Sequence, residues 1–263
     1  MRVLLGTFVE AGAHGAQAGA AVEAAFAAIE RAQALWSFHE RDSELSRLNA
    51  APGQAVPVAP STLRLLGACR AMMRRSGGLF DITVGGTLVA SGALPDHGGA
   101  PALARGSVDD ILLGPGTASL RRPVRLTLDG VAKGFAIDLA LSAMRRAGAP
   151  AGWVNAGGDV GVFGELTLPM QRREDDGSLR PLGGLRNAAM ASSRCGPRDP
   201  AFPAEIVAPG PTAPASGIWT VLARSAWRAD ALAKVAALAP PERRVSLVRQ
   251  LGGILVAMEA FAQ

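Results

Sequence analysis

Cysteine and histidine are scarce in this sequence and tyrosine is absent. Its 263 residues include no tyrosine, two cysteines (Cys69 and Cys195) and three histidines (His14, His39 and His97). Two cysteines cannot make a disulfide framework or a four-thiolate zinc site, and the histidines show no metal-ligand spacing. The sequence therefore excludes a disulfide scaffold and a structural zinc domain.

Long hydrophobic runs are also absent. No uninterrupted apolar run approaches the ~20 residues that a membrane-spanning helix needs. The opening stretch MRVLLGTFVEAG is interrupted by Gly6, Thr7 and Glu10 before a signal-peptide core can form. We therefore expect a cytoplasmic protein with no membrane insertion. With 49% apolar residues, a chain of this length can bury its own core.

The charge of the chain comes mostly from arginine. The sequence pI is about 10.4, yet the net charge is only +5. The arginines are scattered in short clusters, so we prefer solvated surface to a nucleic-acid-binding stripe as their interpretation. Among 27 basic side chains there are two lysines, Lys133 and Lys234. A lysine in such a background can mark a position that needs a compact ammonium, although two cases also fit chance.

Apolar periodicity predicts a mixture of helices and strands. We expect helices over residues 16–37, from Ser61 as N-cap to the glycines at 77–78, and over 131–147, 226–238 and 242–251. We expect strands at 111–113, 118–128, 153–155, 160–163, 218–223 and 254–258. We expect a capped turn or loop at 41–53 and exposed loops at 171–184 and 197–214, the latter with a brief strand at 206–207. No repeat or linker divides the chain, which predicts one mixed α+β domain over residues 1–263, with a bilobal form as an alternative.

One segment has the features of a phosphate site. In LTLDGVAKGFAID, residues 126–138, a strand ends, the chain turns at Gly130 and a helix begins. Such a junction directs backbone N–H groups at an anion, and Lys133 adds a positive charge. An ordinary strand–turn–helix connection fits the segment equally well.

Two further segments carry charged side chains. VNAGGDVGVFGE, residues 154–165, is rich enough in glycine to let the backbone approach a ligand, and Asp159 stands at its turn. A plain hairpin explains it nearly as well. ADALAKVAAL, residues 229–238, places Asp230 and Lys234 four residues apart on one helix face, which alone indicates a routine ion pair.

The order of these segments is more specific than any one of them. The matching segments are Leu5-Gly6-Thr7, SELSRLN at 43–49, GLFDITVGGTLV at 78–89, GVAKGFAID at 130–138, NAGGD at 155–159 and ADALA at 229–233. Together they resemble the FAD:protein FMN transferase (ApbE-like) family along nearly the whole chain. The resemblance implies an α+β flavin-binding fold that holds FAD with its diphosphate on Mg²⁺. It also implies transfer of FMN from FAD to a Ser or Thr hydroxyl of an acceptor flavoprotein, with release of AMP.

The resemblance assigns FAD-contacting positions in these motifs. His39 stands where the family commonly has a tyrosine, Leu5 where it has a methionine, and Thr127 where it has an aspartate. The full set of implied FAD contacts is His39, Asn49, Leu79, Phe80, Asp81, Thr127, Lys133, Ile206 and Lys234.

The implied metal ligands are incomplete. The family uses a backbone carbonyl in the glycine turn, here Gly130, with an Asp and a Thr one helical turn apart. Asp230 matches the Asp, but the Thr position is Lys234, whose ammonium cannot ligate a cation and repels it. Our hypothesis is that Lys234 pairs with Asp230, or reaches the diphosphate itself and partly replaces Mg²⁺, so that metal dependence is weakened or lost.

The implied catalytic base is also altered. The family's histidine lies in an HIIDP-like segment that aligns with residues 205–209, where this chain has Glu205 and has Ala208 in place of the Asp. Glu205 and Asp230 are therefore the candidate catalytic residues, although a solvated loop residue is the favoured interpretation of Glu205. The alternatives to FMN transfer are a catalytically weak or inactive FAD-binding relative and hydrolysis of FAD to FMN and AMP.

Overall fold

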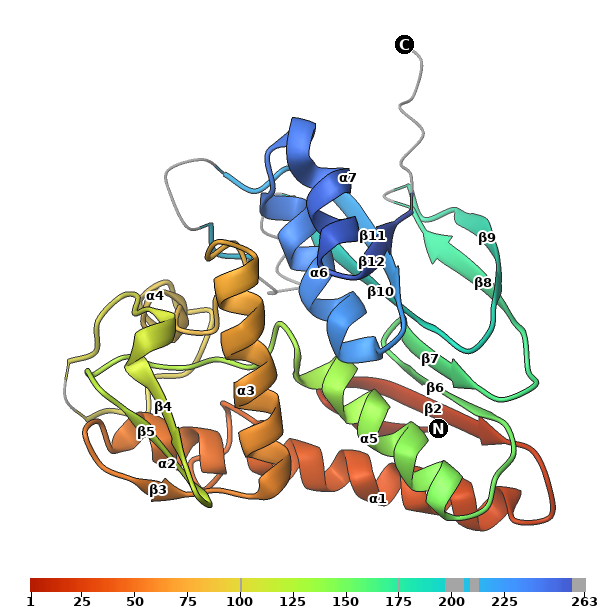
Figure 1. The fold of residues 1–263 in the computed structure, drawn as a ribbon, viewed down its shortest axis with the longest axis horizontal. Helices are drawn as coiled ribbons and strands as arrows, with labels where there is room; N and C mark the ends of the chain where they lie inside the picture. The colour runs from red at the N-terminus through yellow and green to blue at the C-terminus, as the bar shows by residue number, and fades with distance from the viewer. Residues whose placement is uncertain (100, 175, 197–205, 209–212, 257–263) are drawn as a thin grey trace.

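The largest element of the computed structural model, which describes residues 1–99, 101–174, 176–196, 206–208 and 213–256, is a seven-stranded antiparallel sheet (Figure 1). Its strands, in spatial order, are β1 (Arg2–Leu4), β2 (Thr7–Ala13), β6 (Gly152–Ala156), β7 (Asp159–Phe163), β10 (Ala189–Cys195), β11 (Gly217–Ala223) and β12 (Gly253–Leu255). The sheet combines strands from both ends of the chain, with β1 at one edge and β12 at the other.

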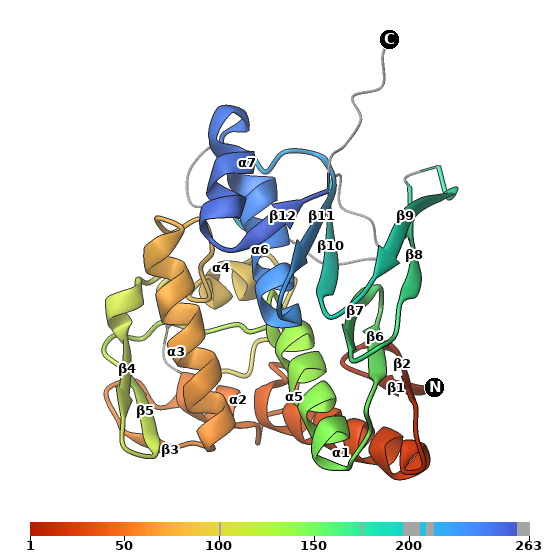
Figure 2. The same cartoon turned by 45° about the vertical axis from the view of Figure 1, so that its right-hand side comes forward.

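Helices cover one face of this sheet. They are α1 (Ala18–Trp36), α5 (Ala132–Arg146) and α6 (Ala226–Leu238), with α7 (Pro241–Gln250) packed on α6 and β12. The apolar residues of α1 recur on one face, where Phe26, Ile29 and Trp36 are buried. Figures 1 and 2 both show the start of α5 meeting the lower end of α6. This junction positions the charged residues discussed below.

A hairpin covers the opposite face of the sheet. It consists of β8 (Leu168–Arg173) and β9 (Leu179–Leu185). Its Leu185 packs with Val160, Val162 and Met190 of the large sheet. The prediction of an exposed loop at 171–184 is therefore wrong. In a hairpin that packs on a sheet, only alternate side chains face the core. The polar and glycine residues between them therefore leave no continuous apolar run that would indicate a strand.

Residues 44–120 form a second part of the molecule, which we call the smaller half. It contains short and long helices and a three-stranded sheet (Figure 2). Its elements are α2 (Glu44–Ala50), β3 (Val56–Pro57), α3 (Pro60–Arg75), α4 (Gly85–Ala90), a 3₁₀ turn (Val108–Asp110), β4 (Ile111–Gly114) and β5 (Thr117–Leu120), with sheet order β3-β5-β4. The predicted turn at 41–53 contains a two-turn helix instead, although it is capped, because the Ser43 side chain accepts the Ser46 N–H.

Most other predicted elements are confirmed within a few residues. The strand predicted at 118–128 is an exception, because β5 ends at Leu120 and residues 121–128, which include Pro123 with no N–H to donate, have no regular structure. Helix α3 differs at its start, where Ala59 is the N-cap and Pro60 opens the helix, so Ser61 is not the cap. The predicted strand at 206–207 is wrong, because these residues have no regular structure. Strands β1, β2 and β10 were not predicted. Among the described residues, no helix has both the length and the apolarity to cross a membrane.

The crossing of α5 and α6 depends on one glycine. A Cβ at Gly134 would lie 2.5 Å from the Ala226 carbonyl oxygen and 2.7 Å from the Trp227 Cα. Both are backbone atoms, so neither can move aside without shifting α6. Only a residue without a side chain lets the two helices approach this closely.

We expect Gly134→Ala to lower the free energy of unfolding by about 3 kcal/mol, because it overpacks a backbone contact. Gly67→Ala in α3 is the matched control, since its Cβ would find Leu113 at a relaxed 3.9 Å. Alanine favours a helix over glycine, so the control should gain up to about 1 kcal/mol. Urea unfolding followed by tryptophan fluorescence measures both. Equal effects of the two substitutions would contradict the close crossing.

Candidate functional site

The only two lysines of the sequence lie in the same place in the fold. Lys133, in the first turn of α5, pairs with Asp159 at the start of β7, with 3.0 Å between Nζ and Oδ2. Lys234 donates a hydrogen bond to Asp230 one turn earlier in α6, as the sequence hypothesis expected. Asp230 also raises the pKa of Lys133 by its charge, so the two pairs are electrostatic neighbours. We call these four residues the lysine–carboxylate cluster.

Backbone groups hold both carboxylates of the cluster. The Gly134 N–H donates to Asp230 Oδ2 at 3.1 Å, across the tight crossing of α5 and α6. The Ser192 N–H donates to Asp159 Oδ1 at 3.3 Å, from the neighbouring strand β10. The second oxygen of Asp230 accepts a hydrogen bond from Lys234, whereas the second oxygen of Asp159 lies at ion-pair distance from Lys133. These contacts fix the cluster between a helix pair and the sheet.

The cluster is asymmetric with respect to solvent. The side chains of Asp159 and Asp230 are 3% and 0% exposed, whereas those of Lys133 and Lys234 are 30% and 19% exposed. The carboxylates therefore lie beneath and the lysines reach the surface. A molecule that approaches from solvent meets positive charge first, which suits an anion.

Burial and neighbouring charge set the protonation of the cluster. Burial raises the pKa of Asp159, and the Asp230 charge adds to this rise while the two lysines oppose it. Burial lowers the pKa of Lys133, but Asp159 and Asp230 outweigh this effect and the net pKa is raised. Lys133 is therefore an ammonium at neutral pH.

The turn before α5 lies beside the cluster. A Cβ at Gly130 would lie 3.7 Å from the Lys234 Cε. Desolvation raises the pKa of the neighbouring Asp129, and the charges of His39 and Lys234 partly oppose this rise. The predicted residues Gly130, Lys133, Asp230 and Lys234 are thus brought together.

The metal donors that the resemblance implied do not fit a cation in this arrangement. Both oxygens of Asp230 already accept hydrogen bonds, from Lys234 and from the Gly134 N–H. Lys234 also extends toward Gly130, the other implied donor. Across the ranges that the structure describes, no group of three or more His, Cys, Asp or Glu residues could hold a metal ion. A cation at Asp230 would have to displace the ammonium.

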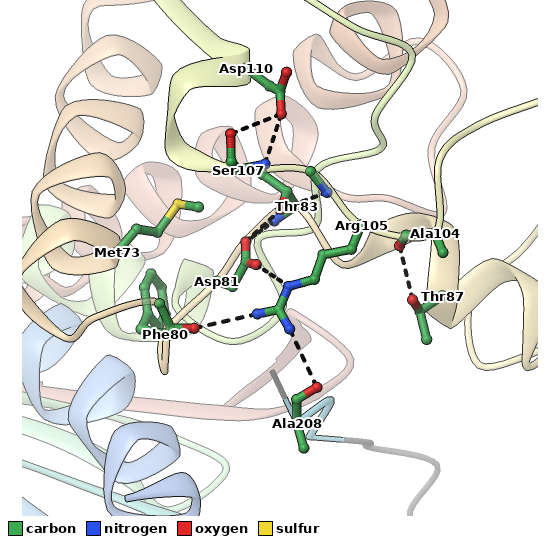
Figure 3. Close-up of polar contacts among 12 residues, drawn as sticks. Met73, Phe80, Asp81, Thr83, Thr87, Ala104, Arg105, Ser107, Asp110 and Ala208 are labelled. Carbon is green, nitrogen blue, oxygen red and sulfur yellow. Dashed lines mark hydrogen bonds and ion pairs between the residues drawn. The ribbon is translucent and has the colours of Figure 1, made fainter. Parts of the chain in front are cut away.

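The predicted flavin-contacting segment has internal partners. Asp81 Oδ2 accepts a 2.6 Å hydrogen bond from Arg105 Nε, and Asp81 Oδ1 accepts from the N–H and hydroxyl of Thr83 (Figure 3). Arg105 also donates to the carbonyls of Gly78 and Ala208, at 3.3 and 3.4 Å. Arg105 thus joins the segment around Asp81 to the described residues 206–208. Sequence reasoning missed it, because nothing local distinguishes it from the other arginines.

Other predicted FAD contacts also have places in the fold. The Asn49 side chain exchanges two hydrogen bonds with the Leu126 backbone, at 2.8 and 2.7 Å. Thr127 and Phe80 are buried, and Leu79 and Ile206 are partly buried against the core. Thr127 Oγ1 accepts a 3.4 Å hydrogen bond from the Asp129 N–H and so contacts the turn beside the cluster. Glu205 lies outside the described residues, and its role as a base stays a prediction.

A cavity of about 400 Å³ lies next to the start of α6, on a side that the cluster does not border. Asp138, from the GVAKGFAID motif, lines it and accepts the N–H groups of Ala226 and Trp227 at 2.8 and 3.0 Å. Asp138 therefore caps α6 and helps to place Asp230 one turn later. Its burial raises its pKa to about 6. Arg145 and Arg224 also line this cavity.

The pKa of Asp138 predicts how stability depends on pH. The folded-state pKa of about 6 exceeds the ordinary value of 3.8, so the folded state holds this proton more tightly. The resulting stability is present below about pH 4 and is lost as the pH rises through about 6. We expect the stability of the natural protein relative to Asp138→Asn to fall by about 2–3 kcal/mol between pH 4 and pH 7. Chemical unfolding of both at each pH measures this difference, and a constant difference would contradict the assignment.

Arg105 should stabilise the folded protein through its ion pair with the buried carboxylate of Asp81. We expect Arg105→Gln to cost about 2–3 kcal/mol of stability, because Asp81 is then left without its cation. Combining it with Asp81→Asn should cost less than the sum of the single changes by about 1 kcal/mol or more. Arg74→Gln, which breaks an exposed pair with Asp109, is the control and should change stability by less than about 1 kcal/mol. Additive effects at Arg105 and Asp81 would contradict the coupling.

Comparison with known proteins identifies the family of this chain. The model of the ApbE family matches residues 5–258. An FAD:protein FMN transferase of Rhodobacter capsulatus is 33% identical over 185 residues, which are 62% of this chain and 34% of the relative, so the match spans about a third of that protein's length.

Solved structures share the fold. The ApbE protein of Thermotoga maritima superposes with a TM-score of 0.80 at 23% identity, over 96% of this chain and 91% of its own. The flavin transferase ApbE of Vibrio cholerae gives 0.77 at 19% identity, over 98% and 96% of the two chains. The flavinyl transferase ApbE of Pseudomonas stutzeri gives 0.75 at 17% identity, over 97% and 95%. The predicted α+β flavin transferase fold is confirmed, and the chain belongs to the ApbE family.

Proposed function

We propose that this protein transfers FMN from FAD to a Ser or Thr hydroxyl of an acceptor flavoprotein and releases AMP. Family membership and the name of the Rhodobacter capsulatus relative support this activity. The observation that carries the proposal is the convergence of Lys133 and Lys234 above two buried carboxylates at the start of α5. This arrangement presents ammonium groups beside a helix N-terminus, which suits a diphosphate.

The reaction is a phosphoryl transfer. The acceptor hydroxyl oxygen attacks the phosphorus of the FMN half of FAD, and the bond from that phosphorus to the bridging oxygen breaks. AMP leaves with the bridging oxygen, while the hydroxyl proton passes to a base or to solvent. Catalysis of such a step needs positioning and stabilisation of charge on the phosphoryl oxygens and the leaving group.

The protein's own residues can supply these needs in part. Lys133 stays protonated and is held in place by Asp159, so it can bind the diphosphate as a fixed charge. Asp230 orients Lys234 and the start of α5 through the Gly134 N–H. Glu205 is the proposed base, on the strength of the aligned segment alone. A cytoplasmic location likewise stays a prediction of the sequence.

Mg²⁺ is the implied partner of the diphosphate in this family, where it would neutralise phosphoryl charge. Here Lys234 occupies the position beside Asp230. We therefore propose that Mg²⁺ has at most a weak role in this protein, and that the acceptor meets FAD at the lysine–carboxylate cluster.

The test incubates the purified protein with FAD and a flavoprotein domain that offers a Ser or Thr acceptor, with and without Mg²⁺. We expect equal amounts of AMP, measured by chromatography, and covalent FMN, measured by in-gel flavin fluorescence. AMP without labelled acceptor indicates hydrolysis, and retained FAD without AMP indicates a binding protein. Either result would contradict transfer.

Lys133→Met should weaken FAD binding and transfer about tenfold or more, because it removes one charge-assisted contact. Arg64→Met is the control, since Arg64 is an exposed cation on α3 in the smaller half. The control should leave FAD affinity, measured by quenching of flavin fluorescence, unchanged. Equal affinities of the two variants would show that the diphosphate does not bind at Lys133.

A further inference from the structure

We propose that Lys234 replaces the divalent cation in this protein, so that two ammonium groups bind the FAD diphosphate and FAD binding needs no Mg²⁺. The inference rests on the proposed function, because FAD is the ligand in both. It goes further by assigning the charge that neutralises the diphosphate to a side chain of this chain. Four observations support it.

The first observation is the hydrogen bonding of Asp230. Its side chain is fully buried, and its two oxygens accept from Lys234 Nζ and the Gly134 N–H. A cation that bound this carboxylate would have to displace a bonded ammonium and would then lie within repulsive range of it. Asp230 therefore acts as the anchor of Lys234 instead of a metal ligand.

The second observation is the space around Lys234. The end of its alkyl chain lies beside Gly130, where a Cβ would be 3.7 Å from the Lys234 Cε. Gly130 and Asp230 are the two positions that the resemblance offered as metal donors. The ammonium group thus lies on Asp230 and its alkyl chain passes Gly130. Lys234 therefore contacts Asp230 and lies close to Gly130.

The third observation is the direction in which the charges face. Lys133 and Lys234 retain 30% and 19% exposure above carboxylates that are 3% and 0% exposed. An anion from solvent therefore meets the ammonium groups before it meets the carboxylates. Each ammonium has three N–H donors, so it can keep its carboxylate and still bind a phosphate oxygen.

The fourth observation is the choice of residue type. The sequence has 27 basic side chains, of which these two are lysines. An ammonium is a compact point charge, as a small metal ion is, whereas a guanidinium is a planar fork. Both exceptions to the arginine bias lie in one cluster, which favours a specific need over chance.

The test measures FAD binding by flavin fluorescence in EDTA and in millimolar Mg²⁺, for the natural protein and for Lys234→Thr and Lys234→Met. We expect the natural protein to bind FAD equally in both, within about twofold. Both variants should bind FAD about tenfold or more weakly in EDTA, as for the loss of one charge-assisted contact. Mg²⁺ should restore binding to Lys234→Thr, because threonine offers an oxygen beside the freed Asp230, and should restore less in Lys234→Met.

Riboflavin, which has no phosphate, provides the control ligand. Its affinity should be the same for all three proteins, because the ring system does not contact Lys234 in this account. A loss of riboflavin binding in the variants would show that Lys234 only supports the fold, and would overturn the proposal. Titration with Mn²⁺ followed by its paramagnetic resonance signal adds a direct readout, in which Lys234→Thr binds the ion and the natural protein does not.

The outcomes separate the inference from the proposed function. If the natural protein binds FAD only with Mg²⁺, the replacement of the cation by Lys234 is overturned while the proposed function stands. If the natural protein binds FAD in neither condition, the proposed function fails and the inference fails with it. Equal binding in both conditions, with metal-responsive binding in Lys234→Thr, supports the inference.

Discussion

The contact between Lys234 and Asp230 is the interaction on which the rest of this site depends. A fully buried carboxylate is costly unless a cation and hydrogen bonds satisfy it, and here Lys234 and the Gly134 N–H do so. That N–H is within reach because Gly134 lets α5 and α6 cross closely. The same crossing brings Lys133, the residue directly before Gly134 in α5, to the cluster. The fold and the positive charge of the site therefore have a common origin.

Elements with a strong local pattern could be predicted from the sequence. The long apolar stripe of α1, the turn and helix at 129–146 and the hairpin around Gly157–Gly158 are each defined by spacing within a few residues, and all are observed, whereas the strand predicted before that turn is not. The hairpin of β8 and β9 and the strand β10 were not predicted from the sequence. Their burial depends on packing against distant strands, and their polar and small residues carry no periodic signal of their own.

In the functional site, too, contacts within one element could be predicted from the sequence, whereas contacts between distant segments could not. The pairing of Lys234 with Asp230 could be expected from i, i+4 spacing in one helix. Its burial could not, because that depends on α5, nearly a hundred residues earlier in the chain. Asp159 was noted at its turn, but its pairing with Lys133 requires the sheet. Arg105 gave no local signal, since its partners Asp81 and Ala208 come from two separate segments. Family resemblance added what spacing could not, by marking which short motifs belong together.

A family can keep its fold while one position of its site changes chemical type. An ammonium brings one positive charge and three donors, is covalently attached and needs no ion from solution. A divalent cation brings two charges but must be bound and retained. In this chain the surrounding glycine turn, carboxylate and backbone N–H are all compatible with the ammonium, so the change is accommodated locally and does not require a new fold.

The most direct measurement uses the small number of lysines. Protein labelled with ¹⁵N at the lysine side-chain nitrogen should give two ammonium signals, one for Lys133 and one for Lys234, in a ¹H–¹⁵N spectrum. This account predicts that FAD added in EDTA shifts both signals, whereas riboflavin shifts neither. If FAD binds and the Lys234 signal stays unchanged, the diphosphate does not contact this ammonium and the account is contradicted.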